Sequence, residues 1–151
     1  MMNRINRRLF AVAVILGALT HQGAARAGRQ LAIVVNRSAS TSSLTADAVK
    51  SYFLKQHKQW PSGEKVRPVQ QEGAAHAVFL SKVLKMSSAD YERYWLERKY
   101  SAAETPPKTV EDGEAVVKFV GALNGAIGYI DVSQLDAKAR DKLRVIHVVS
   151  Y

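Results

Sequence analysis

The chain has 151 residues, with 22 lysines and arginines, 13 aspartates and glutamates, and no cysteine. This length favours a single domain. The lack of cysteine excludes a disulfide scaffold, a thiol nucleophile and a cysteine-ligated metal site. Charged residues make up 23% of the chain and hydrophobic residues 47%, a composition typical of globular proteins rather than disordered or fibrous ones.

Residues 1–27 have the three parts of a secretory signal peptide. Arginines give a positive start, an apolar run of 11 residues extends from Leu9 to Leu19, and Ala25-Arg26-Ala27 offers a small-residue cleavage site. A membrane-spanning helix needs ~20 apolar residues, so the run is too short to span, and an uncleaved N-terminal anchor is the alternative. We expect cleavage near Ala27, a periplasmic or secreted location, and no integral membrane segment in residues 28–151.

The predicted cleavage changes how the net charge is interpreted. The whole chain carries a formal charge of +9, but residues 1–27 contain four arginines and no acid. Residues 28–151 therefore keep 18 basic and 13 acidic side chains, a net charge of +5, and no block of five like charges occurs among them. This pattern is typical of a solvated surface that mildly favours anions. We predict no nucleic-acid partner.

Hydrophobic patterning predicts that strands alternate with helices in residues 28–151. The predicted strands are 31–35, 66–69, 126–130 and 143–149; helices are predicted to start at Thr45, Gly73 and Ser87, and a fourth to run from about Glu111 to Leu123. The alternation predicts an α/β fold, a small mixed or parallel sheet with flanking helices in one domain. The apolar run 31–35 suits a strand covered on both faces, as in a parallel sheet. Pro68 should lie at an edge or a strand end.

Motifs of common enzymes are missing from the sequence. HExxH, GxSxG and the phosphate-binding loop do not occur. The three histidines of residues 28–151 have no carboxylate at ligand spacing, so we predict no metal site, no cofactor and no catalytic residue; an enzyme without a recognisable motif is the least favoured hypothesis. Tyr91, Tyr94 and Trp95 share a helix face, which packing explains better than ligand stacking.

Two loops that precede helices offer groups to an anion. Small residues at a helix start leave backbone N–H groups open to an anionic ligand. If the strands before the two loops are neighbours, their carboxyl ends form a crevice of the kind that binds ligands in α/β folds. The candidate ligand-binding residues are Arg37, Ser38, Ser40 and Thr41 in the first loop, and Gln71, Gly73, Ala74, Ala75 and His76 in the second.

Several short segments follow one another in a distinctive order. They are Ile33-Val-Val-Asn36, Leu44-Thr-Ala-Asp-Ala-Val49, Trp60-Pro-Ser-Gly63, Glu72-Gly73 before Phe79, and Asn124-Gly-Ala-Ile-Gly-Tyr129. In this order they resemble the phosphate-type ABC-transporter substrate-binding proteins of the type 2 periplasmic binding fold, and more closely their short single-lobe relatives. The resemblance covers nearly all of residues 30–131. It implies one lobe of that fold, binding of phosphate or another small oxyanion, and an ABC transporter or another protein as partner.

The second loop departs from the pattern of this family. The family normally has an arginine before the glycine and a Ser-Gly-Thr-like run after it, whereas the sequence reads Gln70-Gln71-Glu72-Gly73-Ala74-Ala75-His76. Loss of two hydroxyl donors weakens anion binding on the order of 10²–10⁴-fold, and Glu72 repels an anion. The resemblance therefore implies weak solute binding. The alternative is a protein-interaction or accessory role with a decayed anion site, and a second chain could supply the missing lobe.

Overall fold

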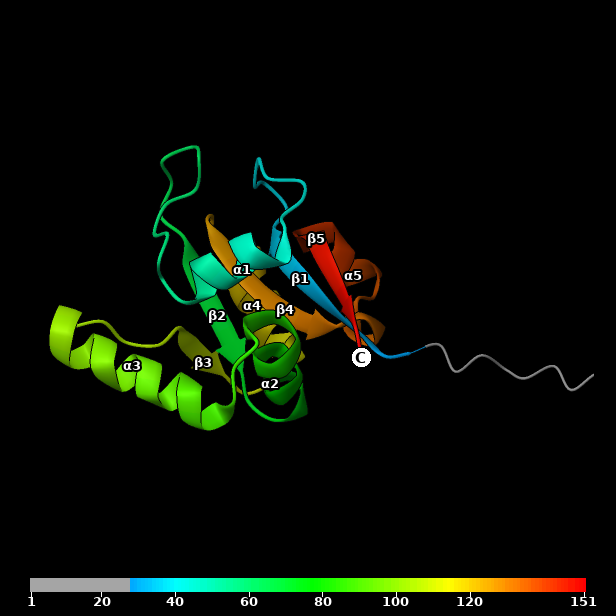
Figure 1. The fold of residues 1–151 in the computed structure, drawn as a ribbon. Helices are drawn as coiled ribbons and strands as arrows, with labels where there is room; N and C mark the ends of the chain where they lie inside the picture. Colours follow the sequence, from blue (N-terminus) through cyan, green and yellow to red (C-terminus); the bar gives the residue numbers. More distant parts are fainter. Residues whose placement is uncertain (1–27) are drawn as a thin grey trace, which may run out of the picture.

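The structure, a computed structural model, describes residues 28–151 and has a five-stranded sheet at its centre. Helices cover both faces of the sheet (Figure 1). The strands are β1 (Gln30–Asn36), β2 (Arg67–Gln71), β3 (Lys108–Val110), β4 (Ala126–Asp131) and β5 (Leu143–Ser150), in the spatial order β3-β2-β4-β1-β5. The helices are α1 (Ala46–Phe53), α2 (Ala74–Phe79), the π-helical η1 (Leu80–Leu84), α3 (Ser88–Ala102), α4 (Gly113–Ala122), the 3₁₀ turn η2 (Val132–Gln134) and α5 (Ala137–Lys142). The predicted α/β class with a mixed sheet is confirmed, and the predicted signal peptide lies outside the described residues.

The core consists of two apolar clusters, one on each face of the sheet. Leu31, Ile33 and Val35 of β1 join the cluster beneath α1, η1 and α3, whereas Ala32 and Val34 join the cluster beneath α4 and α5. All five side chains are fully buried, which confirms a strand covered on both faces. The expectation of parallel pairing is wrong for β1, because β1 runs antiparallel to both of its neighbours, β4 and β5.

The parallel part of the sheet is centred on β2. This strand runs parallel to β4 on one side and to β3 on the other. Pro68, its second residue, is opposite Ile127 of β4, and pairing with β3 begins only at Val69. Pro68 thus lies at the strand end, as predicted, where its missing N–H interrupts the fewest ladder hydrogen bonds.

Polar side chains start the helices where the sequence predicts them. The amide of Ala48 donates to Thr45 Oγ1 at 3.2 Å, and the amide of Asp90 donates to Ser87 Oγ at 3.1 Å. These bonds satisfy amides that have no partner in the first helical turn. Within residues 28–151, none of the helices combines the length and the apolar character that a membrane crossing requires.

Asp131 joins the two ends of the described chain. Arg29 Nη2 donates to its Oδ2 at 2.9 Å, and the Tyr151 hydroxyl donates to the same oxygen at 2.8 Å. The hydroxyl and the amide of Ser133 donate to Oδ1 at 2.6 and 2.9 Å. Burial alone would raise the pKa of Asp131, but these hydrogen bonds together hold its pKa well below the usual range.

We expect Asp131→Asn to remove part of the acid sensitivity of folding. The pKa of Asp131 in the folded state lies below its value of about 3.9 in the unfolded state. The stability that the ionised Asp131 gives to the folded protein is therefore complete above about pH 4, and it is lost as the pH falls through the folded-state pKa. The variant should lose about 1–3 kcal/mol of unfolding free energy at pH 7. When urea unfolding is repeated at decreasing pH, its unfolding free energy should fall less steeply than that of the wild type. The exposed Asp141→Asn is the control; an equal loss in both variants would contradict the prediction.

Candidate functional site

The two predicted ligand loops lie at opposite ends of the sheet. β4 separates β1 from β2, and β1 and β2 run in opposite directions relative to it. The end of β1 therefore lies beside the start of β2, where Val35 and Pro68 both pair with Ile127. Figure 1 shows the loop after β1 at the top of the sheet and α2 at the bottom. The predicted crevice is therefore wrong, since its two strands are neither adjacent nor parallel.

The first loop fastens the end of β1 to the helices beside it. Arg37 Nη1 donates to the carbonyl oxygen of Arg140 at 2.9 Å, and Ser38 Oγ donates to Asn36 Oδ1 at 2.7 Å. Asn36 Nδ2 in turn donates to the carbonyl oxygen of Val120 at 2.9 Å. These side chains already have partners within the fold. Ser40 and Thr41 belong to the same loop, so none of the four candidates of this loop joins the second one.

The second loop turns β2 into α2 through an unusual backbone conformation. Gly73 has φ +83° and ψ −153°, a region that is essentially restricted to glycine. The amides of His76 and Ala77 donate to the carbonyl oxygen of Gly73 at 3.1 and 3.3 Å. Within residues 28–151, the amides of Gly73, Ala74 and Ala75 have no hydrogen-bond acceptor. Three consecutive amides are thus available to an anion, and we call residues 73–76 the glycine edge.

A buried polar network lies behind the glycine edge. Gln71 Nε2 donates to the carbonyl oxygen of Tyr129 at 2.7 Å, so the Gln71 side chain is engaged in the core and is 5% exposed. The Tyr129 hydroxyl lies 2.8 Å from His76 Nδ1. Burial lowers the pKa of His76, which favours the neutral imidazole at pH 7. His76 can therefore offer a hydrogen bond at neutral pH, and a positive charge only in more acidic solution.

The glycine edge is open and has no lysine or arginine. The exposed Glu72 precedes it, and none of five cavities of about 220–850 Å³ in residues 28–151 includes residues 72–76 in its lining. An anion held there would stay in contact with water, where charge interactions are strongly reduced. Within the same residues, no cluster of three His, Asp or Glu could hold a metal ion.

Two residues that support the glycine edge were not among the predicted site residues. Gln70 accepts a hydrogen bond from the Tyr91 hydroxyl at 2.5 Å and donates to Thr109 Oγ1 at 2.9 Å, which ties β2 to α3 and β3. Tyr129 links β4 to His76. A tyrosine hydroxyl that is buried with an otherwise apolar strand needs a hydrogen-bond partner in the core. The tyrosine in the apolar strand 126–130 is therefore the sequence feature that could have pointed to Tyr129.

Comparison with solved structures identifies the fold. An ABC-type phosphate transport receptor from Vibrio cholerae superimposes with a TM-score of 0.59 at 18% identity, over 79% of this chain and 46% of the receptor. PstS from Borrelia burgdorferi gives 0.60 at 12% identity, over 78% and 46%. A protein from Clostridium perfringens, described as a phosphate ABC transporter substrate-binding protein with bound phosphate, gives 0.60 at 14% identity, over 78% and 44%. Neither a family model nor a curated protein sequence matches the chain.

These matches establish the fold class of the described residues. The chain spans less than half the length of each of the three structures. The sheet and its helices correspond to one lobe of the substrate-binding-protein fold. At this level of identity the likeness concerns the fold, and the ligand has to be argued from the residues of the chain itself.

Proposed function

We propose that the protein is an exported solute-binding module that holds phosphate or another small oxyanion at the glycine edge. The observation that carries the proposal is the row of three amides without acceptors at Gly73, Ala74 and Ala75, on a fold shared with phosphate-binding proteins. Backbone amides at a helix start bind anions without any basic side chain. The proposal assigns no catalytic step and no cofactor, and includes export with cleavage near Ala27.

Weak affinity is part of the proposal. Alanines stand where hydroxyl donors would strengthen the site, Gln71 is bonded to Tyr129, and Glu72 places a negative charge next to the amides. The same observations favour the second candidate function, an accessory module that binds a protein and has lost its anion. In either case an ABC transporter or another protein is the proposed partner, and a second chain could complete the site by covering the open edge.

The clean test of the glycine edge is a substitution at Ala74. Gly73→Asp is unsuitable because its φ of +83° would strain any other residue. Ala74 is the exposed first residue of α2, where an aspartate favours the helix start but repels a bound anion. We expect Ala74→Asp to weaken phosphate binding by about tenfold or more, measured by isothermal titration calorimetry, while the uncharged Ala74→Asn changes it little.

The pH dependence of binding provides a second readout in the same experiment. Burial lowers the pKa of His76, so its positive charge appears only as the solution becomes acidic. The affinity for sulfate, whose own charge is constant over this range, should therefore increase as the pH is lowered from 7.5 towards 5.5. If the wild-type protein shows no saturable heat with phosphate or sulfate over this range, the solute-binding function is rejected. The accessory function would then remain as the explanation of the fold.

A further inference from the structure

A concentration of positive charge lies at the other end of β2. The loop between α1 and β2, the start of β2, the loop before β3 and the end of α4 enclose a cavity of about 520 Å³. Its only lining carboxylate belongs to Glu104. We call this cavity the basic groove; the lysines and the arginine that line it are Lys55, Lys58, Lys65, Arg67 and Lys108.

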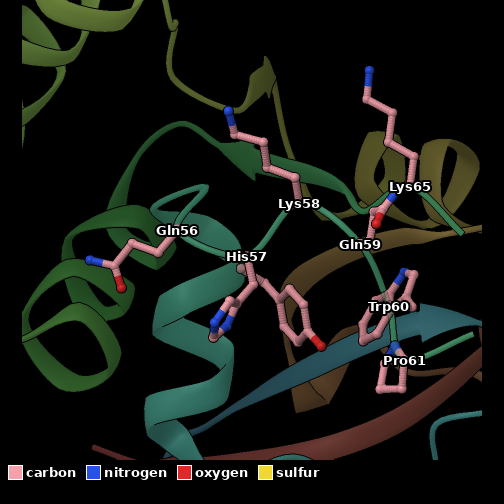
Figure 2. A pocket seen from close by; sticks show the side chains of 8 residues that line it. Gln56, His57, Lys58, Gln59, Trp60, Pro61 and Lys65 are labelled. Carbon is pink, nitrogen blue, oxygen red and sulfur yellow. The ribbon is translucent and has the colours of Figure 1, made fainter. Parts of the chain in front are cut away.

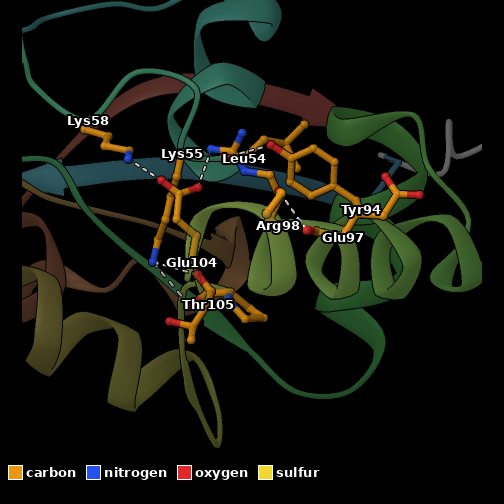
Figure 3. Close-up of polar contacts among 10 residues, drawn as sticks. Leu54, Lys55, Lys58, Tyr94, Glu97, Arg98, Glu104 and Thr105 are labelled. Atoms are coloured by element: carbon orange, nitrogen blue, oxygen red, sulfur yellow. Dashed lines mark hydrogen bonds and ion pairs between the residues drawn. The ribbon is translucent and has the colours of Figure 1, made fainter.

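Glu104 neutralises only part of the positive charge of the basic groove. Its carboxylate forms ion pairs with Lys58 and with Arg98 (Figure 3). Lys55 points its ammonium group at the carbonyl oxygen of Thr105 at 2.8 Å. Within residues 28–151, Lys65, Arg67 and Lys108 form no ion pair with a carboxylate. Three cations of the groove therefore lack a counter-charge.

The positive charges of the groove act on one another. Burial is the largest cause that lowers the pKa of Lys55, and the charges of Lys65 and Lys58 lower it further against the opposing effect of Glu104. A bound anion would relieve this repulsion. Lysine ammonium groups bind phosphate as mobile point charges and do not require a fixed planar geometry.

The groove continues into a second cavity, so basic side chains are spread over a larger space than one anionic group needs. An adjoining cavity of about 850 Å³ shares Tyr52, His57, Lys58 and Lys65 with it. Lys58 and Lys65 project to the same side in Figure 2. Val66, Phe119 and Leu123 contribute apolar wall, so the space is a groove and not a flat charged face. Sites of about 300–1,000 Å³ are typical for small ligands.

We propose that the basic groove binds a polyanion built of several phosphate groups. This site goes beyond the proposed function, since Arg67 begins β2 and Gln71 ends it, which separates the groove from the glycine edge by a strand length of at least about 13 Å. A free polyphosphate and the phosphate headgroups of an anionic lipid surface share this chemistry. The two sources are distinguished by experiment.

The test combines a groove variant with a charge-matched control. Two lysines and one arginine are replaced by glutamine in each protein, so both have the same net charge. The control positions lie on helices away from the groove. The groove variant is Lys65→Gln/Arg67→Gln/Lys108→Gln, and the control is Lys82→Gln/Arg93→Gln/Lys138→Gln. Circular dichroism verifies that both are folded.

Binding is measured by calorimetry with inorganic triphosphate and by co-sedimentation with vesicles of phosphatidylcholine with and without phosphatidylglycerol. We expect saturable binding that falls about tenfold or more in the groove variant, stays within about twofold in the control, decreases with salt and persists in Ala74→Asp. Saturation by triphosphate identifies a free polyphosphate, whereas groove-dependent binding only to the anionic vesicles identifies headgroups. An absence of both, an equal loss in the control, or a loss in Ala74→Asp would overturn the proposal.

Discussion

Gly125→Ala is expected to cause one of the largest losses of stability in this protein, about 3–5 kcal/mol of unfolding free energy. Gly125 has φ +75°, and a Cβ atom there would collide with the carbonyl oxygen of Lys65. Its own carbonyl oxygen accepts hydrogen bonds from the amide of Arg67 at 2.9 Å and from Trp60 Nε1 at 3.1 Å. Because the obstructing oxygen belongs to the backbone, the loop before β4 cannot relax without breaking these bonds.

Gly63→Ala is the matched control for this prediction. Gly63 has φ +87° but no atom within 4 Å of an added Cβ, so the substitution introduces only the backbone strain of about 1–2 kcal/mol. Urea unfolding monitored by tryptophan fluorescence compares the two variants. Equal losses would show that the contact with Lys65 does not matter. Accumulation of Gly125→Ala in an unfolded state, with Gly63→Ala folded, agrees with the expectation.

Tyr129→Ala should destabilise the protein by a similar amount, about 3–5 kcal/mol. The side chain is fully buried, and its ring stacks on Phe79 with centroids 4.0 Å apart and planes at 8°. Burial also raises the pKa of its hydroxyl, which therefore stays protonated. Removal of the side chain would leave a cavity between β4 and α2, and His76 would lose its hydrogen-bond partner.

Two further variants separate the contributions of Tyr129. Tyr129→Phe keeps the ring but leaves His76 Nδ1 without its partner at 2.8 Å, so we expect a loss of about 1–3 kcal/mol. Tyr100 is 81% exposed, and Tyr100→Ala should stay within about 0.5 kcal/mol of the wild type. Thermal unfolding ranks the three variants. A Tyr129→Phe protein as unstable as Tyr129→Ala would mean that the hydrogen bond outweighs the packing.

The positions of most elements could be predicted because local chemistry fixes them. Each predicted strand overlaps an observed one, and Thr45 and Ser87 cap the helices as expected. β3 was missed because it has only three residues, of which Lys108 and Thr109 are exposed. α5 was missed because its sequence, AKARDK, buries only Ala139 and therefore shows no apolar periodicity.

The candidate site could be predicted only in part, because strand direction is not encoded in a fully buried apolar run. Leu31 to Val35 would be buried on both faces whether β1 ran parallel or antiparallel to its neighbours. The predicted crevice depended on the parallel choice, and the antiparallel pairing with β4 carries Arg37 and its loop to the other end of the sheet. The basic groove is likewise assembled from segments that are far apart in the sequence.

The bonds around Asp131 have a consequence for how this lobe can be connected to other parts of a protein. The amide of Tyr151 donates to the carbonyl oxygen of Arg29 at 2.9 Å, and Figure 1 shows the C-terminus beside the start of β1. The polypeptide therefore enters and leaves the sheet at a single point. Any neighbouring domain joined at that point would lie at the end of the sheet that carries the glycine edge, and away from the basic groove at the start of β2.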